Sequence, residues 1–86
     1  VYKNLGNIFV RKGEFDLAEE NYNKAYTLNP LSDVLLVNIG TLQIQQKDFE
    51  KSVYCFRKAI SLNPNNDKAW VGLAMSHHEV GDLELS

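Results

Sequence analysis

The run His77-His78-Glu79 holds the residue types that most often bind a metal ion or transfer a proton. Adjacent residues on a helix point about 100° apart, so these three side chains cannot converge on one ion. No second His or Cys stands at the spacing of a zinc motif such as HExxH. We therefore expect a packed His77, a solvated His78 and no bound metal.

Cys55 is the single cysteine, which excludes an internal disulfide framework. We expect it to lie half-buried on a helix, and the sequence identifies no nearby base that would activate its thiol. No Ser/His/Asp constellation, Gly-rich phosphate loop or catalytic pair of carboxylates is present. The expectation is a chain that is not an enzyme and needs no cofactor, although a catalytic domain could exist elsewhere in a longer parent chain.

Composition narrows the class of protein. The 86 residues are 44% hydrophobic and 23% charged, with a net charge of −2 and no basic cluster, so nucleic acid is a poor candidate ligand. No apolar run approaches the roughly 18 residues of a membrane-spanning helix. There is no signal-like segment and no initiator Met. We expect a piece of a longer soluble protein, with the cytoplasm as the expected compartment, although the sequence itself does not identify it.

An internal repeat of the sequence predicts where the helices that carry the candidate residues begin and end. Ala25-Tyr-Thr-Leu-Asn-Pro30 returns 34 residues later as Ala59-Ile-Ser-Leu-Asn-Pro64. The residue before a proline is disfavoured in the α region, so a helix should end near each Asn. Ser32 and Asn66 then suit the N-caps of the next helices, and each is followed by an aspartate that suits the positive helix end.

The spacing of apolar residues predicts five helices and the start of a sixth, and no strand. The helices are expected at residues 1–12, 14–28, 33–46, 49–62 and 67–80, followed by a turn at Gly81-Asp82 and a stub at 83–86. Connections of a few residues favour antiparallel neighbours. We expect one all-α domain over residues 1–86, divided into repeat units at 1–32 and 33–66 and a partial unit at 67–86.

These residues resemble the tetratricopeptide repeat (TPR), whose pattern W-x2-L-G-x2-Y…A-x3-F…P covers the whole chain. The matching residues of the two full units are Tyr2, Leu5, Gly6, Phe9, Ala18, Tyr22, Ala25 and Pro30, then Leu36, Ile39, Gly40, Ser52, Phe56, Ala59 and Pro64; those of the third are Trp70, Leu73, Ala74 and Gly81. The chain departs from the pattern where Gln43 and His77 replace the aromatic Phe9, and where Lys47 replaces the turn glycine.

The resemblance implies a right-handed superhelix of antiparallel helix pairs, in which the first helix of each unit lines a concave face that commonly binds peptides. If the motif residues pack inward, the opposite stripe of each first helix lies on that face. The predicted peptide-binding residues are Lys3, Asn4, Asn7, Arg11, Val34, Val37, Asn38, Thr41, Gln45, Lys68, Val71 and Met75.

Two features of this stripe suggest how a partner would be held. Asn4 and Asn38 repeat at 34 residues, and an amide can both donate to and accept from an extended peptide backbone. Val34, Val37, Val71 and Met75 make the middle of the stripe apolar, which is typical of a partner site. Asparagine is also a common surface residue, and the apolar middle could equally receive another turn of the solenoid or a helix of the same parent protein.

A sharper version of this hypothesis is a carboxylate clamp, as in chaperone-binding TPR domains. Lys3, Asn7, Asn38 and Lys68 fall at matching places, and together they would suit an anion through charge-assisted hydrogen bonds. The fifth place is Gly72 rather than Arg.

The predicted function is therefore a protein–protein interaction scaffold that binds an extended peptide or a helix of a partner protein, without membrane insertion. Two alternatives stay open. The chain could be the substrate-recognition arm of a larger enzyme such as a glycosyltransferase, or a structural array that self-associates through its truncated repeat ends. Under every alternative, residues 81–86 are expected to be frayed or to pack on a neighbouring molecule, because the third unit has only the start of its second helix.

Overall fold

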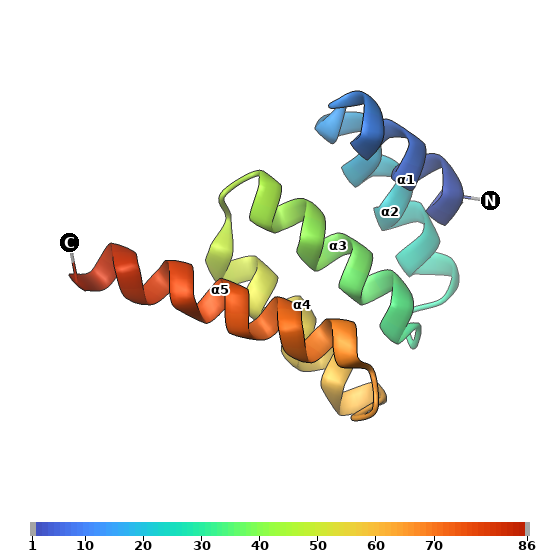
Figure 1. Cartoon of the computed structure of the whole chain (residues 1–86). Coiled ribbons are helices and arrows are strands. Elements are labelled where there is room, and N and C mark those ends of the chain that lie inside the picture. The colour runs from blue at the N-terminus through green and yellow to red at the C-terminus, as the bar shows by residue number, and fades with distance from the viewer. Residues whose placement is uncertain (1, 86) are drawn as a thin grey trace.

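The computed structural model describes residues 2–85, with the side chains of residues 4–81. They form five helices in a row, with no strand among the described residues: α1 (Tyr2–Lys12), α2 (Phe15–Leu28), α3 (Asp33–Gln45), α4 (Phe49–Leu62) and α5 (Asp67–Leu85) (Figure 1). The short connections fold α1 with α2, and α3 with α4, into hairpins, with α5 against α4. The predicted all-α class is confirmed.

Two helices, α3 and α5, begin with the N-cap side chains that the sequence predicts. Oγ of Ser32 accepts from the backbone N–H of Leu35 at 3.2 Å, and Oδ1 of Asn66 accepts from that of Ala69 at 3.2 Å. The turn of the first hairpin uses Gly13 at φ 78°, while Lys47 takes the left-handed conformation at φ 63° in the second. Lys47, which replaces the turn glycine of the repeat pattern, therefore adopts the same left-handed conformation as Gly13 although it carries a side chain.

The expected turn at Gly81-Asp82 is wrong, because α5 continues through it to Leu85. Gly13 ends its helix by adopting a positive φ, whereas Gly81 remains within the helix. Continuing the helix through Leu85 satisfies the backbone groups of the described residues after Gly81 locally.

The core consists of two clusters, and each of them joins successive elements of the repeat. The first contains Tyr22 and lies between α2 and α3, and the second contains Phe56, which is only 1% exposed, and lies between α3, α4 and α5. A Cβ atom added at Gly6 would lie 2.5 Å from the Tyr22 ring, and one added at Gly40 would lie 2.8 Å from the Phe56 ring. The missing glycine side chains therefore make room for one aromatic ring in each hairpin.

Further contacts fix successive hairpins to one another. The Phe56 ring also fills the space above Gly72 of α5, and the buried hydroxyl oxygens of Ser52 and Ser76 lie 2.8 Å apart between α4 and α5. Lys58 of α4 donates to the hydroxyl of Tyr26 in α2. Its ammonium nitrogen lies 5.1 Å from the ring centroid, beyond this hydroxyl, so the contact is a hydrogen bond and not a cation–π interaction.

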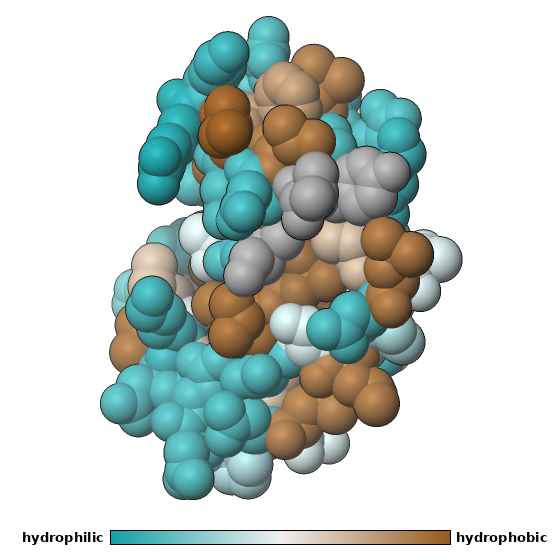
Figure 2. All heavy atoms as spheres, turned by 90° about the vertical axis from the view of Figure 1, so that its right-hand side faces the viewer, coloured by the Kyte–Doolittle hydropathy of each residue, from teal (hydrophilic) through white to brown (hydrophobic). Residues whose placement is uncertain are grey.

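The helices are arranged in two layers. The first helices of the units are neighbours, because α1 contacts α3 and α3 contacts α5, while α2 and α4 lie behind them (Figure 1). In Figure 2, apolar side chains occupy the hollow that separates the first hairpin, at the top of the view, from the rest of the molecule below. This arrangement leaves one open surface over α1, α3 and α5 and a second opening between the two hairpins.

Candidate functional site: the groove over α1, α3 and α5

Two hollows meet on the surface formed by the first helices. The larger, of about 570 Å³, lies between α3 and α5, and the smaller, of about 200 Å³, lies between α1 and α3. Asn38 and Thr41 of α3 line both hollows. The two hollows therefore adjoin at these residues, and we call them together the inner groove.

The structure brings together most of the residues predicted for this face. Those that line the inner groove are Asn7, Arg11, Val37, Asn38, Thr41, Gln45, Lys68, Val71 and Met75. Asn4 and Val34 are exposed but line neither hollow, and the side chain of Lys3 lies outside the described residues. The groove is thus centred on α3, between Arg11 at one end and Lys68 at the other.

Two expectations about this face need correction. Val37 was predicted to be open, but it is only 7% exposed and packs in the core cluster of Phe56. Gly72, the fifth place of the predicted clamp on this face, is also buried, with the Phe56 ring where its Cβ would lie. The reason is that α5 packs closely on both α3 and α4, which turns the α5 end of the stripe into an interface.

The polar side chains of the groove differ in how far they are already hydrogen-bonded. Oδ1 of Asn7 accepts from the hydroxyl of Tyr22, and the Thr41 hydroxyl donates to the Val37 carbonyl at 2.9 Å. Burial raises the pKa of the Tyr22 hydroxyl, which keeps it protonated and able to donate. Asn38 makes no side-chain hydrogen bond with any described residue, so its amide is available to a ligand.

The floor and the ends of the groove have different chemistry. Val71 and Met75 are 59% and 52% exposed, and Ile44 lies beside them, so the larger hollow is mainly apolar. Arg11 and Lys68 form no salt bridge with a described residue, and Asp67 is the only acidic side chain among the described residues that line the two hollows. An apolar floor between two available cations is suited to a segment that carries an apolar side chain and acidic groups.

Comparison with known families agrees with this repeated architecture. One tetratricopeptide repeat model matches residues 1–30 and 34–66, and a second matches residues 55–86. The chain belongs to the tetratricopeptide repeat family. TPR domains generally mediate protein–protein interactions, and they are typically scaffolds without catalytic function. No curated protein matches the sequence.

The histidines of the TPR domain give no sign of a chemical site. His77 and His78 are both exposed, so the expectation of a packed His77 is wrong. His77 lies on the side of α5 that a second helix covers in the first two units, and no described helix covers it here. Among the described residues there is no cluster of three His, Cys, Asp or Glu side chains that could hold a metal ion, and no helix is long and apolar enough to span a membrane.

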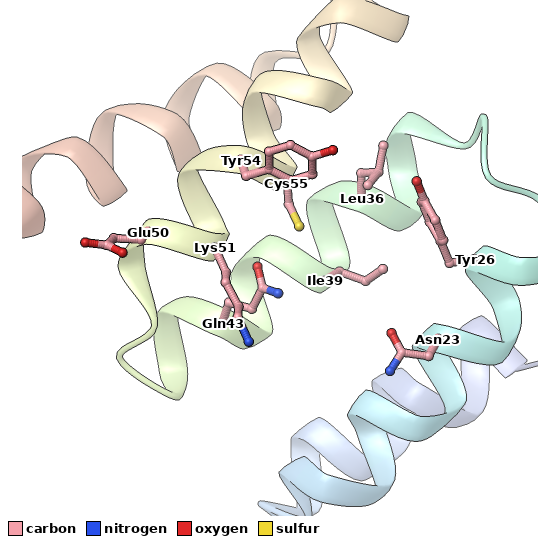
Figure 3. A pocket seen from close by; sticks show the side chains of 9 residues that line it. All are labelled: Asn23, Tyr26, Leu36, Ile39, Gln43, Glu50, Lys51, Tyr54 and Cys55. Atoms are coloured by element: carbon pink, nitrogen blue, oxygen red, sulfur yellow. The ribbon is translucent and has the colours of Figure 1, made fainter.

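The sequence reasoning missed a second cavity of the TPR domain, which lies between the two hairpins. It has a volume of about 430 Å³ and opens between α2, α3 and α4 (Figure 3). We call it the interpair pocket; its lining residues are Asn23, Tyr26, Leu36, Ile39, Gln43, Glu50, Lys51, Tyr54 and Cys55. One signal could have indicated it, since Gln43 replaces the aromatic residue found at Phe9 in the first unit.

Proposed function

We propose that this TPR domain binds an extended segment of a partner protein in the inner groove. Asn38 would pair with the peptide backbone, the hollow between α3 and α5 would take an apolar side chain, and Arg11 and Lys68 would attract acidic groups. The observation that carries the proposal is that Asn38 lines both hollows and that its amide has no partner among the described side chains.

The substitution Asn38→Ala tests this proposal. Peptides selected from a random library on the wild-type domain should bind the variant at least about 5-fold more weakly, because a lost hydrogen bond leaves a buried peptide group unpaired. The half-buried Asn38 supports no other described side chain, so the free energy of unfolding should change by less than about 0.5 kcal/mol. Titration calorimetry and urea unfolding measure the two quantities.

The exposed Asn65 provides the matched control, because it lines neither the inner groove nor the interpair pocket. Asn65→Ala should leave peptide affinity unchanged. An Asn38→Ala domain that unfolds would show that Asn38 is structural, and a selected peptide that keeps its affinity for a folded Asn38→Ala domain would place binding outside the groove. Amidation of the peptide C-terminus separates capture of an internal segment, which tolerates amidation, from a carboxylate clamp, which does not.

The outer side of α5 favours a second candidate function, self-association. Trp70 is 50% exposed and Ala74 is exposed, whereas their counterparts Leu36 and Gly40 are buried beneath α4. If this side mediates association, light scattering should give a mass that rises with protein concentration, and Trp70→Glu should abolish the rise. A constant monomer mass at millimolar concentration would count against this candidate.

A further inference from the structure

The interpair pocket lies on the side of α3 that faces away from the inner groove. Leu36, Ile39 and Gln43 line the pocket at i, i+3 and i+7 spacing, while Asn38 and Thr41 line the groove. At about 100° per residue these two sets point in nearly opposite directions. The pocket and the groove are therefore separate surfaces, and a ligand of one does not fill the other.

The size and walls of the interpair pocket suit an aromatic group. Its volume of about 430 Å³ is within the range of roughly 300–1,000 Å³ that is usual for ligand pockets. Tyr26 forms one wall with Leu36 and Ile39, and the sulfur of Cys55 points into the same space (Figure 3). Burial raises the pKa of the Cys55 thiol, so it acts here as a small apolar group. The exposed polar side chains, including Asn23 and Lys51, lie at the rim of the pocket.

Gln43 supplies the polar feature of this pocket. It occupies the repeat position of Phe9, whose ring packs against the core cluster that contains Tyr22. The second hairpin thus lacks an aromatic ring at the matching place. Oε1 of Gln43 is shut off from solvent and has no hydrogen-bond partner among the described residues, which is unfavourable for a buried acceptor. The Gln43 side chain also interacts with the Cys55 thiol and lowers its pKa against the larger effect of burial. Because Gln43 is half-buried and lines the pocket, rotation of its amide is the movement that would bring Oε1 to a ligand there.

We propose that the interpair pocket receives an aromatic side chain that carries a hydrogen-bond donor, such as tryptophan, from a partner protein. The ring fills the apolar space between the hairpins, and its N–H donates to Oε1 of Gln43. Tyr54, which is 66% exposed at the rim, offers the partner a flat aromatic surface around this anchor. Buried tryptophan and tyrosine side chains are frequent anchors of protein interfaces, which agrees with a family that binds proteins.

The first experiment compares two ring systems of nearly the same shape. Indole carries an N–H donor and indene does not, so the pair isolates the predicted hydrogen bond. Titration of ¹⁵N-labelled protein should shift the amide resonances of Ile39, Gln43 and Cys55, with indole binding about 5-fold more tightly than indene. Equal affinities, an absence of shifts, or shifts confined to Val71 and Met75 of the inner groove would each overturn the proposal.

Variants on the two sides of α3 sharpen this comparison. Gln43→Leu removes the acceptor and should reduce the preference for indole over indene to about 1. Gln45→Leu makes the same change on the exposed groove side and should keep the 5-fold preference. Circular dichroism reports whether each variant is folded; if Gln43→Leu is not, the comparison of indole with indene on the wild type still decides the matter. A preference that survives in a folded Gln43→Leu would contradict the proposed hydrogen bond.

N-acetyl-tryptophanamide distinguishes a partner side chain from a free aromatic molecule. It places the indole ring on a peptide backbone, and it should bind at least as tightly as indole itself. If indole binds but N-acetyl-tryptophanamide does not, the pocket admits only free small molecules and the protein partner is excluded. This outcome is independent of Asn38→Ala, because that variant alters only the inner groove.

Discussion

At the scale of single residues, repeat positions with related sequences have different roles. Asn7 and Thr41 are equivalent in the 34-residue register, as are Tyr22 and Phe56. The hydroxyl of Tyr22 is hydrogen-bonded to Asn7, whereas Phe56 has no hydroxyl and Thr41 bonds to its own helix backbone. On the inner stripe, Asn7 is therefore engaged by Tyr22, whereas Asn38 has no side-chain hydrogen bond with a described residue and is available to a ligand.

Asp33 provides a test at the same scale. Its carboxylate accepts from the side-chain amides of Asn66 at 2.8 Å and Asn63 at 3.0 Å, which ties the start of α3 to the connection between α4 and α5. The hydrogen bond from Asn66, followed by that from Asn63, lowers the pKa of Asp33. Because the folded-state pKa lies below the unfolded value of about 3.9, the stabilisation is present above this value and is lost as the pH falls through the folded-state pKa.

We therefore expect Asp33→Asn to reduce the free energy of unfolding at pH 7 and to have a smaller effect at pH 3. Urea unfolding of both proteins at the two pH values measures this difference. Asp16→Asn is the matched control, because Asp16 also lies in the first turn of its helix but has no side-chain amide partner among the described residues. An Asp33→Asn effect that is the same at both pH values would refute the assigned role of the carboxylate.

At the scale of elements, the ring of Phe56 determines how closely three helices pack. It projects from α4 between Gly40 of α3 and Gly72 of α5, and it is only 1% exposed. A Cβ atom at Gly72 would lie 2.3 Å from this ring, and the surrounding core leaves the ring little room to move. The close contact of α5 with α4 therefore requires glycine at position 72.

Two glycine substitutions in α5 separate the steric role of Gly72 from the general effect of replacing glycine by alanine in a helix. Gly72→Ala should lower the free energy of unfolding by about 1–3 kcal/mol, because the added methyl overpacks the core against Phe56. Gly81 lies in the same helix, and a methyl group added there would meet no atom within 4 Å. Gly81→Ala should therefore raise the free energy of unfolding by up to about 1 kcal/mol, because alanine has the better helix propensity. Chemical denaturation measures both changes. A stabilising Gly72→Ala would show that α5 can shift away from Phe56.

At the scale of the whole molecule, the two hairpins share a core but do not meet completely. Tyr26 and Ile39 pack against both core clusters, so they join the first hairpin to the second. The same two side chains line the interpair pocket, which remains open where the hairpins diverge. The inner groove and the interpair pocket are consequently two faces of one junction, with α3 between them.

The sequence by itself determined the repeat period, the family and the helix ends up to the start of α5, because these depend on local chemistry. Proline disfavours a helical residue before it, Ser32 and Asn66 cap the helices that follow, and apolar spacing selects the buried side of each helix. Nine of the twelve residues that the periodicity assigned to one face line the inner groove, and their role in peptide binding stays a prediction. These features do not depend on the residues that neighbouring helices contribute.

Only the tertiary structure decided which of those residues are accessible and where the second cavity lies. Val37 and Gly72 belong to the open stripe by periodicity, yet α5 and the Phe56 ring bury them. Gln43 departs from the repeat pattern in the sequence, but its buried acceptor and the adjoining cavity exist only where α2, α3 and α4 come together. The physical reason is that burial and cavities depend on residues that neighbouring helices contribute, whereas helix formation depends mainly on residues within one turn of each other.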